Sequence, residues 1–276
     1  MSAPALESIG GHPEGIGRTR RTDTWWIGPA TTVLVLTSFA VYATWAAFQG
    51  EHYYASPYLS PFYSPVLFTD PSVPGSVPGW HAAFGGWPNW WPSFIPQSPA
   101  LLILVFPGIF RFTCYYYRKA YYRAFAGSPP ACAVVSMTKH TGPYHGETRF
   151  LIFQNLHRVT LYFALLYVPI LYADAIASFI NHGQLGVGVG SMVLLVNATL
   201  LAGYTFGCHS FRHLVGGGSD CMSCGAATLR FRTWKKATWL NERHMQFAWA
   251  SLFWVAFTDI YVRLCSMGVW TDARLF

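Results

Sequence analysis

Long apolar segments alternate with polar, basic or Pro- and Gly-rich connections along most of the chain. A transmembrane helix needs roughly 20 consecutive residues that are mostly apolar. The segments that meet this requirement are residues 25–48, 98–117 with a polar aromatic continuation to 125, 150–180, 185–211 and 237–264. The third and fifth are long enough that we expect them to tilt or to project from the membrane. The pattern predicts an all-α integral membrane protein whose five transmembrane helices form a bundle.

Basic residues are distributed unevenly between the connections, which predicts the orientation. Lys and Arg precede the first segment, follow the second and precede the fifth, whereas residues 49–97 contain neither. Because an excess of Lys and Arg marks cytoplasmic loops, we expect the N-terminus in the cytoplasm and the C-terminus outside. The predicted divisions are a cytoplasmic tail (1–24), a transmembrane domain (25–266) with an outer loop (49–97) and cytoplasmic loops (126–148 and 214–234), and an outer tail (267–276).

Composition supports a lipid environment and excludes other classes. Of the 276 residues, 53% are hydrophobic and 11% are charged, whereas soluble domains have about 25% charged residues. The net charge of +7 does not indicate a nucleic-acid partner, because the basic residues lie in short blocks between apolar segments. The first segment is longer than the roughly 7–15-residue apolar region of a signal peptide, so we expect it to remain as a span.

Four of the predicted spans carry a Cys or His in the half predicted to face the cytoplasm. These residues are Cys114, His157, Cys208 and His244. Ligand-type or ionisable residues inside a membrane are costly and indicate function by default. At about 1.5 Å per residue, the four lie at similar depths, within roughly one or two helical turns. A bundle of this kind can direct one ligand inward from each helix, so we predict a shared metal site.

Two Cys and two His residues suit more than one metal. Zinc binds such a set tetrahedrally, and a Rieske-type 2Fe-2S cluster takes two Cys on one iron and two His on the other. We favour the iron–sulfur cluster because zinc has no redox chemistry to offer a lipid-embedded bundle. The alternative is one haem b, held by His157 with His209 or His244. Neighbouring positions on a helix differ in direction by about 100°, so the sequence leaves open whether Cys208 or His209 points inward.

Polar side chains near the same depth suggest where a quinone would bind. Quinone carbonyls need hydrogen-bond donors beside an apolar channel. The candidates are Tyr116, Tyr117, Arg158, His209, Arg212, His213 and Trp239.

Three other features have plainer interpretations. Cys221 and Cys224 form a CxxC spacing, which we interpret as a reduced thiol pair at a protein interface, with a zinc site shared with Cys132, His140 or His145 as the alternative. Asp174 and Asp259 lie near the outer ends of their spans, where interfacial hydration is the expected role and a proton-transfer group is the alternative.

Several stretches resemble a known family: residues 112–123, 128–134, 155–158 and 208–217. The chain resembles the membrane-anchor (cytochrome b-type/C) subunit of succinate dehydrogenase, respiratory complex II, of the actinobacterial single-anchor kind. The resemblance implies a plasma-membrane protein that binds the iron–sulfur subunit on its cytoplasmic face. It would take electrons that the flavoprotein subunit removes from succinate and deliver them to a quinone, with menaquinone the expected type. The first span has no His, unlike the anchors that hold two haems in five helices, which leaves room for the Rieske-type cluster.

Two further hypotheses belong to other functional classes. A transporter would need polar residues that continue into the outer half, or helices broken at the midplane, and the ligand-type residues here stop on one side. A purely structural anchor would tolerate Ala at His157 and His244 with quinone reduction intact. On the leading hypothesis the chain has no complete active site of its own.

Overall fold

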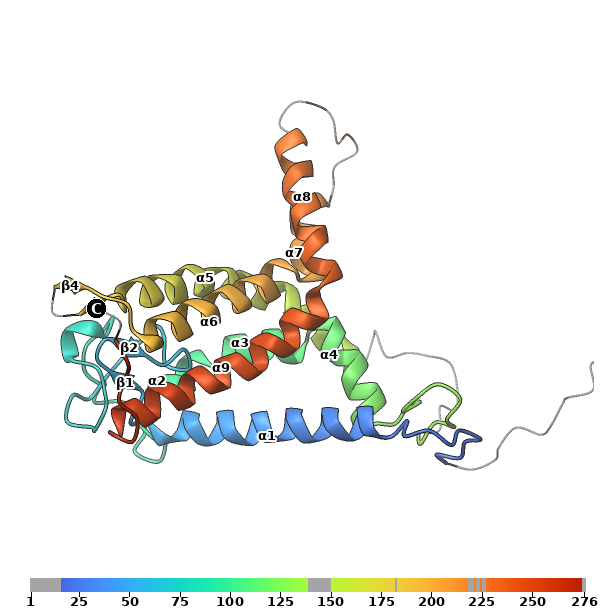
Figure 1. Ribbon diagram of the computed structural model, residues 1–276, viewed down its shortest axis with the longest axis horizontal. Helices are drawn as coiled ribbons and strands as arrows, with labels where there is room; N and C mark the ends of the chain where they lie inside the picture. Colours follow the sequence, from blue (N-terminus) through green and yellow to red (C-terminus); the bar gives the residue numbers. More distant parts are fainter. Residues whose placement is uncertain are drawn as a thin grey trace, which may run out of the picture.

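The computed structural model describes residues 16–138, 150–181, 183–217, 221, 224 and 227–274. Four of its helices are long and apolar enough to cross a membrane, judged over the described residues alone. They are α1 (Ile27–Gln49), α5 (Leu156–Ala177), which follows η4 (Phe150–Asn155), α6 (Val189–Phe206) and α9 (His244–Ser266). All four run along the long axis of the molecule (Figure 1). The prediction of a mostly helical membrane protein is confirmed.

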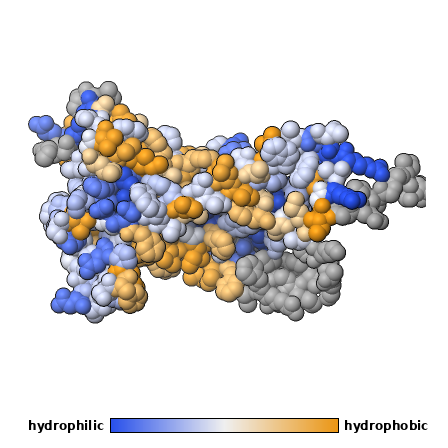
Figure 2. Space-filling model, turned by 90° about the horizontal axis from the view of Figure 1, so that it is seen from below, coloured by the Kyte–Doolittle hydropathy of each residue, from blue (hydrophilic) through white to orange (hydrophobic). Residues whose placement is uncertain are grey.

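The helices differ in how far they are enclosed. Helix α6 packs between α5 and α9, whereas only Ala46 and Ala47 are buried in α1. A helix that is apolar all round and yet exposed is suited to contact with lipid. Figure 2 shows apolar residues over much of the middle of the molecule, with hydrophilic residues gathered toward its ends. Below, the outer end is the end that holds residues 49–97, and the inner end is the opposite one, as in the predicted orientation.

The second predicted span is not one continuous helix. It is divided into α2 (Pro99–Ile103), α3 (Val105–Phe112), α4 (Tyr115–Ala120) and η2 (Tyr121–Phe125). Proline removes a backbone donor and obstructs the carbonyl four residues earlier. Pro107 therefore frees the carbonyl of Ile103, which accepts a hydrogen bond from the Tyr167 hydroxyl at 3.2 Å. The five uninterrupted spans expected from hydropathy are thus four long helices and one broken segment.

The fifth predicted span also begins later than expected. Residues 237–242 belong to α8 (Ala227–Glu242), and the chain turns at Arg243, whose φ of −105° and ψ of 11° are not helical. Helix α8 packs on α7 (His209–Gly216) and projects from the side of the bundle (Figure 1). Its basic, polar sequence explains why α8 leaves the bundle, because charged residues are costly inside a membrane.

A compact cap closes the outer end of the bundle. It contains the hairpin of β1 (Tyr54–Ala55) and β2 (Tyr58–Leu59), in which Tyr54 pairs with Leu59, and the short helix η1 (Gly79–His81). A second hairpin, β3 (Ile180–Asn181) with β4 (Gln184–Leu185), joins α5 to α6. Inside the cap, the rings of Tyr53 and Tyr63 stack with centroids 4.2 Å apart. The cap is therefore a packed element with an aromatic core.

A buried polar cluster fastens the cap to α1 and α9. Arg263 Nε lies 2.8 Å from Asp259 Oδ2, and these side chains are 7% and 0% exposed. Asp259 also accepts hydrogen bonds from Tyr42 of α1 and Ser60 of the cap. We call these four residues the outer lock. The expected hydration of Asp259 is therefore wrong, because folding places a cationic partner and two hydroxyls around it. Asp174 accepts from Ser64.

Candidate functional site

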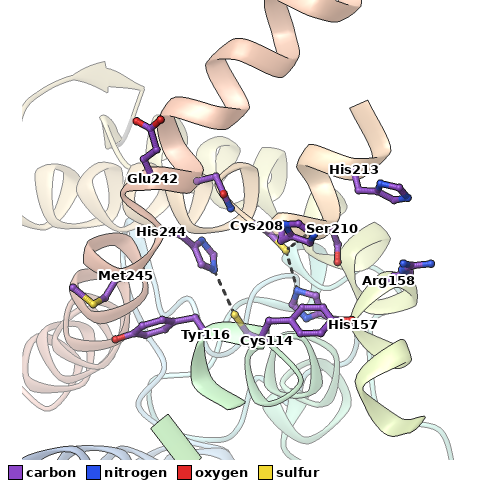
Figure 3. Close-up of a pocket in the computed structure, with 13 residues that line it drawn as sticks. Cys114, Tyr116, His157, Arg158, Cys208, Ser210, His213, Glu242, His244 and Met245 are labelled. Carbon is purple, nitrogen blue, oxygen red and sulfur yellow. Dashed lines mark hydrogen bonds between the residues drawn. The ribbon is translucent and has the colours of Figure 1, made fainter. Parts of the chain in front are cut away.

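The four predicted metal ligands lie where helices begin, rather than midway along them. Cys114 immediately precedes α4, Cys208 immediately precedes α7, His157 is the second residue of α5 and His244 is the first of α9. All four line a single cavity of about 790 Å³ at the inner side of the bundle (Figure 3). The breaks in the spans thus bring together the residues that the depth argument grouped.

The four side chains form two His–Cys pairs. His157 Nε2 lies 2.9 Å from the sulfur of Cys208, and His244 Nε2 lies 3.4 Å from the sulfur of Cys114 (Figure 3). The exposed fractions are 2% for Cys114, 1% for His157, 1% for Cys208 and 8% for His244. Water therefore has little access to either pair, although the cavity adjoins both.

Neighbouring groups fix the orientation of His157. Its Nδ1 lies 2.9 Å from the carbonyl oxygen of Phe110 and 3.2 Å from Thr113 Oγ1. The Phe110 ring stacks on the imidazole, with centroids 4.4 Å apart and an interplanar angle of 4°. A hydrogen bond from Nδ1–H to a backbone carbonyl leaves the Nε2 lone pair free to bind a metal. His157 is therefore held as a metal-binding histidine commonly is.

His244 is held differently. Its imidazole stacks on the Tyr204 ring at 4.9 Å and 12°. Within the described part of the chain, its Nδ1 has no hydrogen-bond partner. The imidazole is thus positioned by aromatic packing, with Nε2 directed at a thiol.

The donor set suits a metal, but the donors are not gathered into one coordination sphere. Among the described residues, no group of three or more His, Cys, Asp or Glu side chains is arranged to hold a metal ion. Two sulfurs and two imidazole nitrogens nevertheless match the donors of a Rieske-type cluster in number and kind. Cys208 forms the contact with His157, while His209 is exposed. The iron–sulfur, haem and zinc assignments remain predictions.

The predicted quinone residues divide into two groups. Tyr116, Arg158, His209 and His213 line the cavity, and Tyr117, Arg212 and Trp239 do not. The second group makes contacts between or along elements: the Tyr117 hydroxyl donates to the carbonyl of Ala248, the guanidinium of Arg212 donates to Thr238, and that of Arg243 lies over the Trp239 ring. These three side chains therefore contact other parts of the protein and do not line the cavity.

Two polar residues beside the donors, the half-buried Arg111 and the buried Tyr204, were missed from the sequence. Arg111 donates to the Tyr117 hydroxyl, to the carbonyl of Ala248 and to Ser251 Oγ, each at 2.9 Å. Its guanidinium carbon lies 4.5 Å from the centre of the Tyr204 ring. Arg111 could have been noticed as a charged residue in an apolar segment, whereas a tyrosine in a span gives little signal.

The Cys221 and Cys224 pair is not the reduced thiol pair that we expected from the sequence. Cys221 and Cys224 are joined as a disulfide, whereas reduced thiols were expected from the rule that intracellular proteins rarely keep disulfides. Two cysteines three positions apart can form a disulfide when the chain between them turns. The amino-acid composition does not reveal such a turn. Of the alternative zinc ligands, His140 and His145 lie outside the described residues.

Comparisons with known proteins agree with this fold. Residues 27–268 match the family described as actinobacterial succinate dehydrogenase subunit SdhC. The chain is also similar to a chain of the Mycobacterium smegmatis Sdh1 complex in the apo form, with 41% sequence identity, a TM-score of 0.81 and 96% of each chain covered. No curated protein matches significantly. The chain therefore belongs to the actinobacterial SdhC family, as a multi-pass plasma-membrane subunit of succinate dehydrogenase, an oxidoreductase.

Proposed function

We propose that this subunit anchors succinate dehydrogenase in the membrane and passes electrons from the iron–sulfur subunit to a quinone. Its membership of the SdhC family and its likeness to a chain of the Sdh1 complex support this role. The observation that carries it is the meeting of two thiols and two imidazoles, from four separate segments, beside one cavity. Succinate oxidation, on the flavoprotein subunit, supplies two electrons, and water supplies the two protons needed to form the quinol.

The proposed electron carrier is a Rieske-type 2Fe-2S cluster, held by Cys114, Cys208, His157 and His244. When bound, such a cluster accepts and releases one electron at a time, at a potential that His ligation raises above that of all-Cys clusters. A haem b would be held by two imidazoles and would leave both thiols without a role, whereas each imidazole lies beside a thiol here. The donor arrangement therefore favours the cluster.

The protein residues around these donors have supporting roles. Phe110 accepts the Nδ1 hydrogen bond of His157 and covers one face of its ring. Tyr204 covers a face of His244. Their rings exclude water from the two imidazoles, and a dry, shaped surrounding is a main determinant of the potential of a metal centre.

The test is the double variant His157→Ala/His244→Ala in the assembled complex, with His81→Ala in the outer cap as the matched control. We expect succinate oxidation with an artificial acceptor to stay largely intact, quinone reduction to be abolished, and one EPR signal of the reduced complex to disappear. Normal quinone reduction in the double variant would refute the ligand assignment and favour a purely structural anchor. If the EPR signal is absent from the wild type as well, an optical spectrum decides for or against haem.

The docking surface for the iron–sulfur subunit follows from the same arrangement. The inner cavity is bordered by Arg158, His213 and Glu242, and the basic helix α8 projects beside it (Figure 1). We assign this end to the iron–sulfur subunit, because electrons must arrive close to the Cys–His pairs. The flavoprotein subunit would then lie farther from the membrane.

A further inference from the structure

A second cavity lies on the outer side of the Cys–His pairs, within the bundle. Its volume is about 170 Å³, and α1, α3, α5, α6 and α9 all contribute to its wall. On α5 the lining residues begin at Ala164 and end at Leu171, seven to fourteen positions beyond His157. At 1.5 Å per residue this is roughly 10–20 Å deeper along the helix. The Cys–His pairs therefore lie between a polar inner cavity and this deeper one.

The wall of the deeper cavity is mostly apolar, and Phe39, Phe62 and Val255 are typical of it. Its polar residues are Ser64 and Tyr167, whose hydroxyls donate to Asp174 and to the carbonyl of Ile103, and Thr205, Arg111 and Tyr204. The Tyr204 side chain is 2% exposed, and its hydroxyl has no hydrogen-bond partner among the described residues. A buried donor without an acceptor is costly, so this hydroxyl indicates that a ligand completes the site.

Arg111 adds unused donors and a positive charge at the same place. A guanidinium has five N–H groups, and the hydrogen bonds of Arg111 use three of them. No described carboxylate forms an ion pair with it. Uncompensated charges inside a membrane are expensive and mark functional sites. The cavity thus presents the donors of Arg111 and Tyr204 to a mostly apolar space.

We propose that the quinone ring binds in this deeper cavity, with a carbonyl oxygen accepting hydrogen bonds from Tyr204 and Arg111. The ligand that this wall complements is flat and apolar and carries an acceptor oxygen, which is the chemistry of a quinone. The position also suits electron transfer, because the Tyr204 ring stacks on His244 at 4.9 Å. This inference rests on the proposed function, and it places the ring apart from the residues predicted from sequence.

The inner cavity is less suited to a quinone. It is lined by the charged side chains of Arg158 and Glu242 and by several His residues besides the thiols. An isoprenoid tail gains nothing from leaving lipid for such a surface. In contrast, the deeper cavity continues the apolar environment of the membrane.

Two substitutions test the site by different means. Tyr204→Phe removes only the hydroxyl, and Gly108→Leu adds a bulky side chain at the wall of the cavity, where a Cβ meets nothing within 4 Å. The matched controls are Tyr172→Phe, a tyrosine on α5 whose hydroxyl bonds to Thr199 at the exposed surface, and Gly28→Leu, which also has open space. Quinone kinetics, dye reduction and EPR are measured on the whole complex.

We expect Tyr204→Phe to raise the KM for a short-chain quinone by about tenfold, the equivalent of roughly 1.4 kcal/mol. Gly108→Leu should nearly abolish quinone reduction, while both variants keep dye reduction and the EPR signal. Unchanged quinone kinetics in both variants would overturn the proposal. If the wild-type complex shows no such EPR signal, the proposed cluster is refuted instead. The quinone kinetics of the two variants would still decide where the quinone binds.

Labelling of the unaltered complex provides a measurement that does not depend on the folding of a variant. An azidoquinone is photolysed with the wild-type complex, and the labelled peptides are identified by mass spectrometry. Labels on α3 and α6 that excess quinone prevents would support the deeper cavity. Labels on α7 or around Arg158 instead would contradict it and favour the inner cavity.

Discussion

Breaking the outer lock should destabilise the subunit more than any change on its exposed surface. In Asp259→Asn, the guanidinium of Arg263 loses its charged partner at 2.8 Å and remains buried. Removing one member of a buried ion pair typically costs about 3–5 kcal/mol, because the remaining charge is uncompensated. Tyr42→Phe removes only one hydrogen bond to the carboxylate, so its cost should be about 1.5–3 kcal/mol.

The double variant Asp259→Leu/Arg263→Met separates charge imbalance from loss of packing. With both charges gone, the desolvation cost of each also disappears, so we expect the double variant to be more stable than Asp259→Asn. The assay is unfolding of the purified complex by SDS in mixed micelles, followed by tryptophan fluorescence. Asp23→Asn, in the exposed pair with Arg21, is the control and should leave the transition unchanged.

Two outcomes would contradict the role that we assign to the outer lock. If Asp259→Asn unfolds within about 1 kcal/mol of the wild type, the buried pair does not carry the attachment of the cap. If the double variant is less stable than Asp259→Asn, the hydrogen bonds from Arg263 to the carbonyls of Glu51 and Ala46 matter more than its charge. Either result would refute the role assigned to the buried charge pair.

Three further predictions concern backbone packing and the cap. Gly207→Ala would place a Cβ 2.9 Å from the carbonyl oxygen of Leu240, so we expect a loss of about 1–3 kcal/mol in SDS unfolding and a lower iron content, because the next residue is a proposed ligand. Tyr167→Phe leaves the carbonyl freed by Pro107 without its donor and should cost about 1–3 kcal/mol in the same assay. Burial raises the pKa of Tyr58 from 10 to about 12. Its stabilising contribution is thus complete below pH 10 and lost as the pH rises to about 12, and Tyr58→Phe should reduce that alkaline loss of stability.

The sequence predicted the grouping of the proposed ligands better than the paths of the helices that carry them. Cys114, His157, Cys208 and His244 line one cavity because they share a depth, and depth follows from counting residues. The turn at Arg243 has no proline or glycine to signal it. It is set by packing of α8 on α7, which a hydropathy profile does not contain.

Long-range partners explain the remaining differences. Asp259 lies at the outer end of an apolar segment, where hydration is the usual outcome. Its hydroxyl partners Tyr42 and Ser60 are 217 and 199 positions away in the chain. Nothing local to Asp259 indicates that the cap folds over it. The unpartnered hydroxyl of Tyr204, judged over the described residues, is likewise a property of the packed bundle, since a tyrosine in a sequence does not reveal whether its hydroxyl finds an acceptor.

The position of the proposed ligands at helix starts bears on how the subunit matures. Because each ligand lies at a joint between segments, α1, α5, α6 and α9 contain their own backbone hydrogen bonds without any metal. The chain can therefore insert into the bilayer and pack before a cofactor arrives. The cavity of about 790 Å³ adjoins all four ligands at the inner end, which allows loading from that end after insertion. Membrane insertion and cofactor delivery become separate steps of biogenesis, and the second can be completed or withheld without repeating the first.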